Sequence, residues 1–150
     1  MRVGVLLHDP WSPERGSADF SFQIYFARPA FRTETPAVLV PKPFFGATIN
    51  AAGRTSHIHA GLAWTLDITD HLFVEAGIAG ALHSGRFDPL PTGRHNAMGC
   101  ALHFRESAGI GVRLDRNWSV IATVEHLSNG GLCNRNRGLT NLGVQVGYRF

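Results

Sequence analysis

Residues 57–83 read HIHAGLAWTLDITDHLFVEAGIAGALH, and this stretch decides the fold of the chain. In both of its halves large apolar residues recur at every second position, and the positions between them are mostly small or polar. Side chains of a β-strand alternate between two faces, so this period of two predicts two strands, each with one apolar face. Thr69 and Asp70 leave room only for a tight turn, which makes the two strands an antiparallel hairpin.

The same alternation recurs along the chain, and together the segments predict eight strands. Their expected ranges are 2–8, 20–26, 43–50, 57–68, 72–83, 100–114, 118–128 and 139–150. Residues 29–41 are interrupted by prolines, and we interpret them as a long connection with room for one short helical turn.

Composition agrees with an all-β protein of one domain. Seventeen glycines, 10% aromatic residues and only 17% charged residues are typical of strands joined by many turns. No apolar run approaches the roughly 18 residues of a membrane helix. The net charge of +3 is spread along the chain, which is compatible with an anionic lipid surface, and no nucleic-acid-binding motif is present.

The connections alternate in length. Those after the first, fifth and seventh strands are loops, and those after the fourth and sixth are tight turns. Loops at one rim and short turns at the other are typical of outer-membrane barrels, of which the smallest have eight strands. We therefore predict that residues 1–150 form a single eight-stranded antiparallel transmembrane β-barrel of the outer-membrane type, although residues 29–41 are long for a turn.

The orientation of the two faces separates this barrel from a soluble, lipid-carrying one, in which the apolar face would line a cavity. The second face carries small residues and opposed charges, and the chain has a single lysine, Lys42, whereas a solvated surface normally carries many. The alternating end at residues 142–150 resembles the terminal signal of bacterial outer-membrane proteins. We therefore place the apolar face toward lipid and the protein in the bacterial outer membrane. No signal peptide is recognisable after Met1, so the chain is either a mature form or lacks its true start.

Two side chains with catalytic potential stand at the end of the seventh predicted strand. His126 and Ser128 share the apolar face of that strand, about 6 to 7 Å apart at Cβ. A serine needs a base within hydrogen-bond reach to attack an ester carbonyl at neutral pH, and His126 can lean toward it. The alternative is that both are ordinary polar residues where a strand leaves the membrane.

The run His126-Leu127-Ser128-Asn129, followed by two glycines, Asn136 and Gly138, resembles the lipid A 3-O-deacylase (PagL-like, acyloxyacyl hydrolase) family. The resemblance implies that His126 is the general base and Ser128 the nucleophile, on the outer wall near the extracellular rim. It also implies an ester-linked 3-hydroxyacyl chain of lipid A, or lipopolysaccharide, in the outer leaflet as the substrate. No metal or organic cofactor is required by this mechanism.

The chain departs from that family at the third catalytic position. The family has an acidic residue near the start of the last strand to orient the histidine, and Thr140 stands there. Thr140 can accept a hydrogen bond but carries no charge. We hypothesise that Glu106 substitutes, because a turn at 115–117 pairs 114 with 118 and hence Glu106 with His126. Alternatively, Glu106 sits at a bulge and turns inward to Arg105 or Arg113.

The remaining candidates have two interpretations each. Asn129 and Asn136 are potential oxyanion donors or loop-stabilising residues. Arg135 and Arg137 are candidates for binding lipid A phosphates, or are simply solvated. Cys100 and Cys133 either pair or remain as separate thiols.

Alternation points Glu125 into the barrel, so we assign it to an interior charge network. His57 and His59 share an interior face, and we assign them structural roles because no carboxylate or cysteine completes a metal set with them. Two other functions stay open: a barrel of the same descent that no longer catalyses, and a soluble lipid-carrying barrel. A homodimer is also an open alternative.

Overall fold

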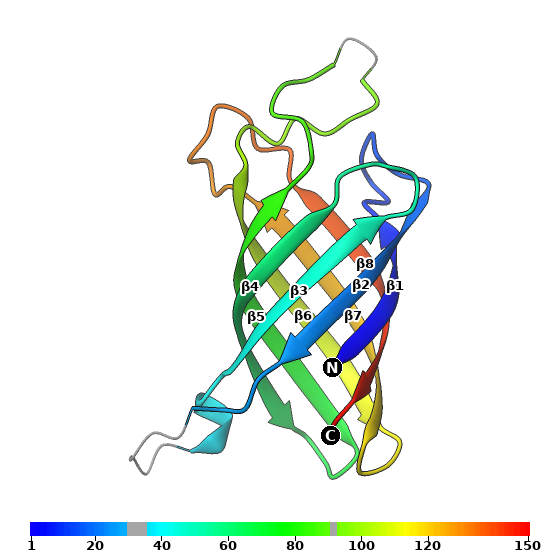
Figure 1. The fold of residues 1–150 in the computed structure, drawn as a ribbon, viewed down its shortest axis with the longest axis vertical. Helices are drawn as coiled ribbons and strands as arrows, with labels where there is room; N and C mark the ends of the chain where they lie inside the picture. Colours follow the sequence, from blue (N-terminus) through cyan, green and yellow to red (C-terminus); the bar gives the residue numbers. More distant parts are fainter. Residues whose placement is uncertain (30–35, 91–92) are drawn as a thin grey trace.

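The structure is a computed structural model that describes residues 1–29, 36–90 and 93–150. Eight antiparallel strands pair in chain order and close on themselves as a barrel (Figure 1). They are β1 (Arg2–His8), β2 (Ser17–Tyr25), β3 (Lys42–Asn50), β4 (His57–Asp67), β5 (Leu72–His83), β6 (Leu102–Arg113), β7 (Trp118–Ser128) and β8 (Leu139–Tyr148). The predicted fold is confirmed.

The bounds of most strands differ from the predicted ones by at most two residues. The largest difference is at β2, which begins at Ser17 rather than at residue 20. Residues 17–19 extend the strand because they continue the pairing with β1, where Ser17 lies opposite His8. The short polar side chains there do not show the apolar alternation from which the strand was predicted.

Most large apolar side chains of the strands point outward, and most of the polar side chains point inward. Val5 is 53% exposed, Ile78 is 49% exposed and Ile110 is 52% exposed, whereas Arg105 and Gln145 are only 2% and 3% exposed. An apolar ligand cavity inside the barrel is therefore excluded, and with it the soluble lipid-carrying alternative. No helix in the described part of the chain is long and apolar enough to cross a membrane.

A dense polar network fills the middle of the barrel. The Arg105 guanidinium donates to Glu125 Oε2 from Nη2 at 2.5 Å and from Nε at 3.0 Å. The other Glu125 oxygen accepts from Asn141 Nδ2 at 3.0 Å and lies 3.3 Å from His57 Nε2. This confirms the interior role predicted for Glu125. A buried charge is tolerated only when it is paired and hydrogen-bonded, and every Glu125 contact comes from a different strand.

The two ends of the barrel differ (Figure 1). Loops 9–16, 51–56, 84–101 and 129–138 share one end, which we call the loop rim. The chain termini, the turns at 68–71 and 114–117 and the connection at 26–41 share the other end. That connection contains the predicted helical turn as η1 (Ala37–Leu39), where Leu39 O accepts a hydrogen bond from Trp64 Nε1; residues 30–35 lie outside the described residues.

Beneath the loop rim, a second buried network holds the loops together. His8 bridges Asp19, 2.9 Å from Nδ1, and Glu14, 3.0 Å from Nε2. Glu14 also accepts hydrogen bonds from the backbone N–H groups of Thr55 and Asn96, so it ties three loops to one carboxylate. Burial alone would raise the pKa of Glu14, but the bonds from His8, Asn96 and Thr55 hold it at about 2.

Glu125→Ala should lower the free energy of unfolding by roughly 3–5 kcal/mol, because it leaves the buried Arg105 guanidinium without its carboxylate. Asp67→Asn is the matched control, since the Asp67–Arg113 pair is at the surface, with Asp67 63% exposed, and should cost at most about 1 kcal/mol. Urea unfolding in lipid vesicles measures both. Equal losses in the two variants would contradict the interior role of Glu125.

Glu14 should make the loop rim acid-sensitive. Its carboxyl has a folded pKa of about 2 against an ordinary 4.5, so its stabilising effect is complete above pH 4.5 and is lost as the pH falls toward 2. Acidification slows amide exchange intrinsically, so the quantity to follow is the protection factor, the intrinsic exchange rate divided by the observed rate. The protection factors of the loop amides should therefore fall over that interval in the natural protein. In Glu14→Gln the protection factors should already be lower at neutral pH, and their further loss on acidification should disappear. An unchanged pH response in Glu14→Gln would refute the assignment.

Candidate active site

The end of β7 brings the candidate base and nucleophile to the outer wall just below the loop rim. His126 is exposed and Ser128 is half-buried, and loop 129–138 begins immediately after them. Leu127, which lies between them, and Glu125, which precedes His126, point inward and are buried. Alternation along the strand therefore places the pair where a lipid acyl chain runs along the wall.

The His126 ring is held from the β8 side. Its Nδ1 lies 2.8 Å from Thr140 Oγ1, the residue opposite it in register. The ring lies over Gly138, where an added Cβ would come 3.1 Å from His126 Cε1, and Gly138 has the positive φ of 70° that glycine tolerates best. Nε2 is left without a hydrogen-bond partner in the described residues, and no hydrogen bond joins it to Ser128.

Glu106 lies opposite His126 in the pairing of β6 with β7, as the turn length predicted. The register runs without a bulge from Phe104 to Arg113, and Glu106 is exposed on the outer wall, so the alternative inward placement is wrong. Among the described residues no hydrogen bond or ion pair joins Glu106 to His126. The orienting contact in this structure comes from Thr140.

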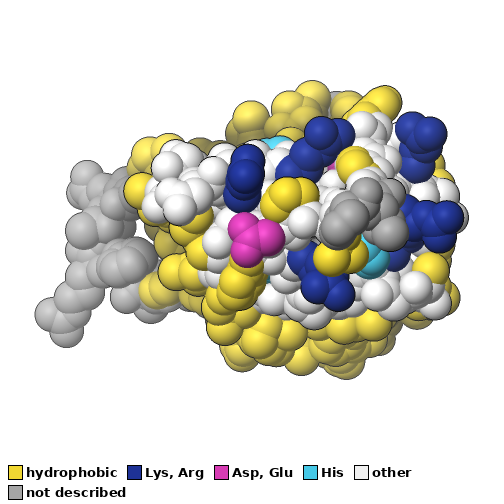
Figure 2. Space-filling model, turned by 90° about the horizontal axis from the view of Figure 1, so that it is seen from above, with side chains coloured by type: hydrophobic (Ala, Val, Ile, Leu, Met, Phe, Trp, Pro, Cys, Tyr) yellow, Lys and Arg dark blue, Asp and Glu magenta, His cyan; other side chains and the backbone are white. Residues whose placement is uncertain are grey.

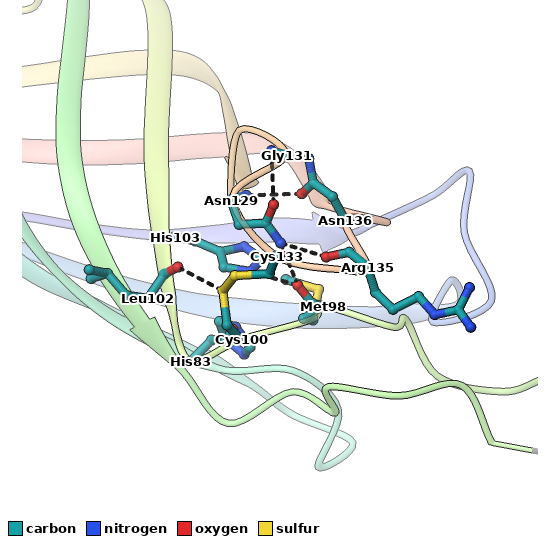
Figure 3. The surroundings of a disulfide bond; sticks show 10 residues. All are labelled: His83, Met98, Cys100, Leu102, His103, Asn129, Gly131, Cys133, Arg135 and Asn136. Carbon is teal, nitrogen blue, oxygen red and sulfur yellow. Dashed lines mark hydrogen bonds between the residues drawn. A yellow bond between two sulfur atoms is a disulfide. The ribbon is translucent and has the colours of Figure 1, made fainter.

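A disulfide between Cys100 and Cys133 fastens loop 84–101 to loop 129–138 (Figure 3). The two Cα atoms are 6.1 Å apart, and 33 positions separate the residues in sequence. This settles the pairing that the sequence left open. Met98 is fully buried beside the bridge, against Leu127 and Leu139. The described part of the loop after β5 is thus joined, by the disulfide and by the packing of Met98, to the end of β7, the start of β8 and the loop between them.

Asn129 organises loop 129–138, as Figure 3 shows. Its Nδ2 donates to Met98 O at 2.9 Å and to Arg135 O at 2.5 Å, and its Oδ1 accepts from Gly131 N at 2.9 Å. With its amide fully used and the residue buried, Asn129 has the loop-stabilising role. Asn136 Oδ1 accepts from Asn129 N at 2.9 Å, and the Asn136 Nδ2 group has no partner among the described residues. Of the two, only Asn136 keeps a free donor.

Six arginines stand on the loop rim, including the predicted Arg135 and Arg137 (Figure 2). They are Arg15, Arg54, Arg86, Arg94, Arg135 and Arg137, and all but the half-buried Arg54 are exposed. The rim loops contain three acidic residues, of which two, Asp9 and Glu14, are buried and only Asp88 is exposed. The described part of the rim therefore presents a basic surface to an approaching ligand.

Sequence reasoning missed the contribution of loop 84–101 to this end of the barrel. Asn96 and Met98 are both fully buried, and they bond or pack against residues far away in sequence. Nothing in the local pattern of that loop separates them from solvated residues. Within residues 1–29, 36–90 and 93–150, no three His, Cys, Asp or Glu side chains are arranged so that they could hold a metal ion.

Comparisons with known proteins point in one direction. The model of a family described as lipid A 3-O-deacylase (PagL) matches residues 6–149. The crystal structure of the outer membrane enzyme PagL superposes with a TM-score of 0.70 at 20% sequence identity and covers 100% of both chains. A de novo designed transmembrane β-barrel matches with a TM-score of 0.61 at 9% identity, over 99% of this chain and 92% of the other. A search of curated protein sequences gives no significant match.

Proposed function

Because the chain belongs to the lipid A 3-O-deacylase (PagL) family, we propose that it is an outer-membrane esterase that removes an ester-linked 3-hydroxyacyl chain from lipid A. Ser128 is the nucleophile and His126 the general base. The observation that carries this mechanism is the placement of both side chains on the lipid-facing wall below the loop rim, with His126 Nδ1 held by Thr140.

The reaction is an acyl transfer in two stages. Ser128 Oγ attacks the ester carbonyl carbon while His126 Nε2 takes the hydroxyl proton. The tetrahedral intermediate collapses, the bond to the sugar oxygen breaks, and His126 returns the proton to that oxygen. Water then attacks the acyl-Ser128 carbonyl carbon while His126 takes a proton from it. The bond between that carbon and Ser128 Oγ breaks, and His126 returns the proton to Ser128 Oγ. The products are a free 3-hydroxy fatty acid and a lipid A with one new hydroxyl group.

Thr140 orients the base in this mechanism. An Nδ1–H that donates to Thr140 Oγ1 leaves Nε2 unprotonated and directed along the wall over Gly138. Leu127 on β7 pairs with Leu139 on β8, and the strands are antiparallel. The same register therefore places Gly138 opposite Ser128. The ring therefore lies over the position opposite the nucleophile, and the mechanism requires His126 Nε2 to come within hydrogen-bond reach of Ser128 Oγ when substrate binds.

Two neighbouring features fit the same substrate. The free Asn136 Nδ2 group is a candidate donor to the oxyanion that develops on the carbonyl oxygen. The arginines of the loop rim, Arg135 and Arg137 among them, fit the phosphate groups of a lipid A headgroup, which lies at the level of the rim when its acyl chains lie along the wall. Guanidinium forks bind phosphates in two-point contacts.

Expression of the protein in a lipid A-producing bacterium should convert lipid A to a species that lacks one 3-hydroxyacyl chain, as read by mass spectrometry of extracted lipid A. Ser128→Ala should abolish the conversion because no nucleophile remains. Ser119→Ala, on the same strand at the far end of the barrel, is the matched control and should convert lipid A normally. Unchanged lipid A in the natural protein, with the barrel folded in the membrane, would instead support a catalytically silent barrel.

The third member of the site can be tested by removing one contact at a time. Thr140→Val keeps the shape but loses the hydroxyl, so kcat should fall roughly tenfold, whereas Thr140→Ser should retain most activity. Glu106→Gln should have the smaller effect, since His126 bonds to Thr140 rather than to Glu106. Deacylation of lipid A in detergent micelles measures these rates. Full activity in both Thr140→Val and Glu106→Gln would mean that neither residue orients the base.

A further inference from the structure

The row of residues that contains His126 continues past Thr140 to a fourth strand. Strand β8 pairs with β1 as well as with β7, and Leu142 lies opposite Leu7 in that pairing. The same register carries residue 9, just beyond the end of β1, to the position opposite Thr140. Glu106, His126, Thr140 and Asp9 therefore follow one another across β6, β7, β8 and the end of β1.

Asp9 adopts an unusual conformation at this point. Its φ of +36° lies in the left-handed region, which few residues other than glycine adopt without cost. The conformation turns the carboxylate back toward β8, where Oδ1 accepts the Thr140 N–H at 3.1 Å. Meanwhile the Asp9 N–H donates to Asn141 Oδ1 at 3.1 Å. The surrounding hydrogen bonds thus hold a strained residue against the residue that contacts His126.

The Asp9 carboxylate is buried without a cation beside it. Asp9 is 5% exposed, and its Oδ2 accepts from Asn96 Nδ2 at 2.6 Å. Among the described residues Asp9 forms no ion pair, because His8, its neighbour in sequence, is engaged by Asp19 and Glu14. A buried carboxylate that has only neutral donors is costly, and such groups concentrate at functional sites.

Asn96 links Asp9 to Gly138, which is the second residue beside the His126 ring. The same Nδ2 group donates to Gly138 O at 3.1 Å. Asp9 therefore holds the start of β8 at two points, Thr140 N directly and Gly138 O through Asn96. Thr140 bonds the imidazole, and Gly138 lies beneath it.

We propose that Asp9 is a positioning residue for His126, acting through Thr140, and that it provides the negative charge that the family's acidic residue would otherwise supply at position 140. The inference rests on the proposed Ser–His mechanism and deepens it. Asp9 does not touch the substrate. Its carboxylate lies within about two strand spacings of the imidazole, or roughly 10 Å. In the dry barrel wall a charge at that distance still favours the imidazolium that forms when Ser128 is deprotonated.

Asp9→Asn tests the role of this charge. Asparagine has the same shape and tolerates positive φ, so the fold should be kept, which the gel mobility of the unheated protein verifies. The kcat for release of the 3-hydroxyacyl chain from lipid A should fall roughly tenfold with KM unchanged. The acid limb of the pH–rate profile should move to lower pH, because loss of the negative charge disfavours protonation of His126. Asp70→Asn, in a turn at the opposite end of the barrel, should match the natural protein.

The other charged and titratable groups around His126 are the same in Asp9→Asn and in the natural protein. They are Glu106, which lies opposite His126 on β6, His103 on the inner face of β6, and Arg135 and Arg137 in the loop after β7.

A second variant, Thr140→Glu, separates the effect of the Asp9 charge from a purely structural effect. With a carboxylate directly on His126, the Asp9 charge is redundant, so adding Asp9→Asn to Thr140→Glu should cost less than about twofold. If Asp9→Asn lowers kcat by the same factor in the natural protein and in Thr140→Glu, Asp9 has only a structural role and the proposal is overturned.

A second readout separates this inference from the identity of the substrate. Labelling of Ser128 by a fluorophosphonate probe reports an activated serine without lipid A, with Ser128→Ala as the blank. Slower labelling in Asp9→Asn than in the natural protein supports the inference even if lipid A is not the substrate. Labelling and deacylation both at the natural rate in Asp9→Asn would reject the inference and leave the proposed function intact.

Discussion

The pairing of β8 with both β7 and β1 is the constraint on which the rest of the structure depends. It closes the barrel, so that each of the eight described strands is paired on both sides. In a membrane an unpaired backbone group costs several kcal/mol. Closure also fixes the neighbours of every residue on β8. Thr140 consequently lies between His126 on one side and the Asp9 position on the other.

Closure separates two environments along each strand. The outer wall is apolar and meets lipid, whereas the interior holds buried charges such as Arg105 and Glu125 in a tightly hydrogen-bonded network. Glu125 and His126 are adjacent in sequence, yet one is buried in that network and the other is exposed on the wall. Alternation thus allows the proposed catalytic base, His126, and a buried structural carboxylate, Glu125, to be neighbours in sequence while they face opposite sides of the strand.

The loop rim connects these environments. The disulfide between Cys100 and Cys133, the Asn129 amide and buried Met98 join loop 84–101 to the loop after Ser128. Asn96 in the same loop bonds to Asp9 and to Gly138. A long loop whose sequence resembles solvated polar sequence therefore carries contacts to the segments that flank the proposed site. In the proposed mechanism these contacts preorganise His126.

The sequence by itself determined the features that depend on local repetition. A period of two specified eight strands and their outward faces, and a three-residue turn at 115–117 specified that Glu106 lies opposite His126. Such features are local because each strand and hairpin is encoded by its own residues. The His-x-Ser motif and the family resemblance likewise required only the end of one strand and the loop after it.

Only the tertiary structure decided the contacts that span the chain. The disulfide between the cysteines, the Glu14 network, the hydrogen bond from Asn129 to Met98 and the position of Asp9 beside Thr140 all join residues from different hairpins or loops. Asp9 and Thr140 are 131 positions apart, and their contact exists only because the last strand returns to the first. No local sequence pattern indicates which residues meet when the barrel closes. Asp9, the residue proposed to position His126, could therefore be identified only from the closed barrel.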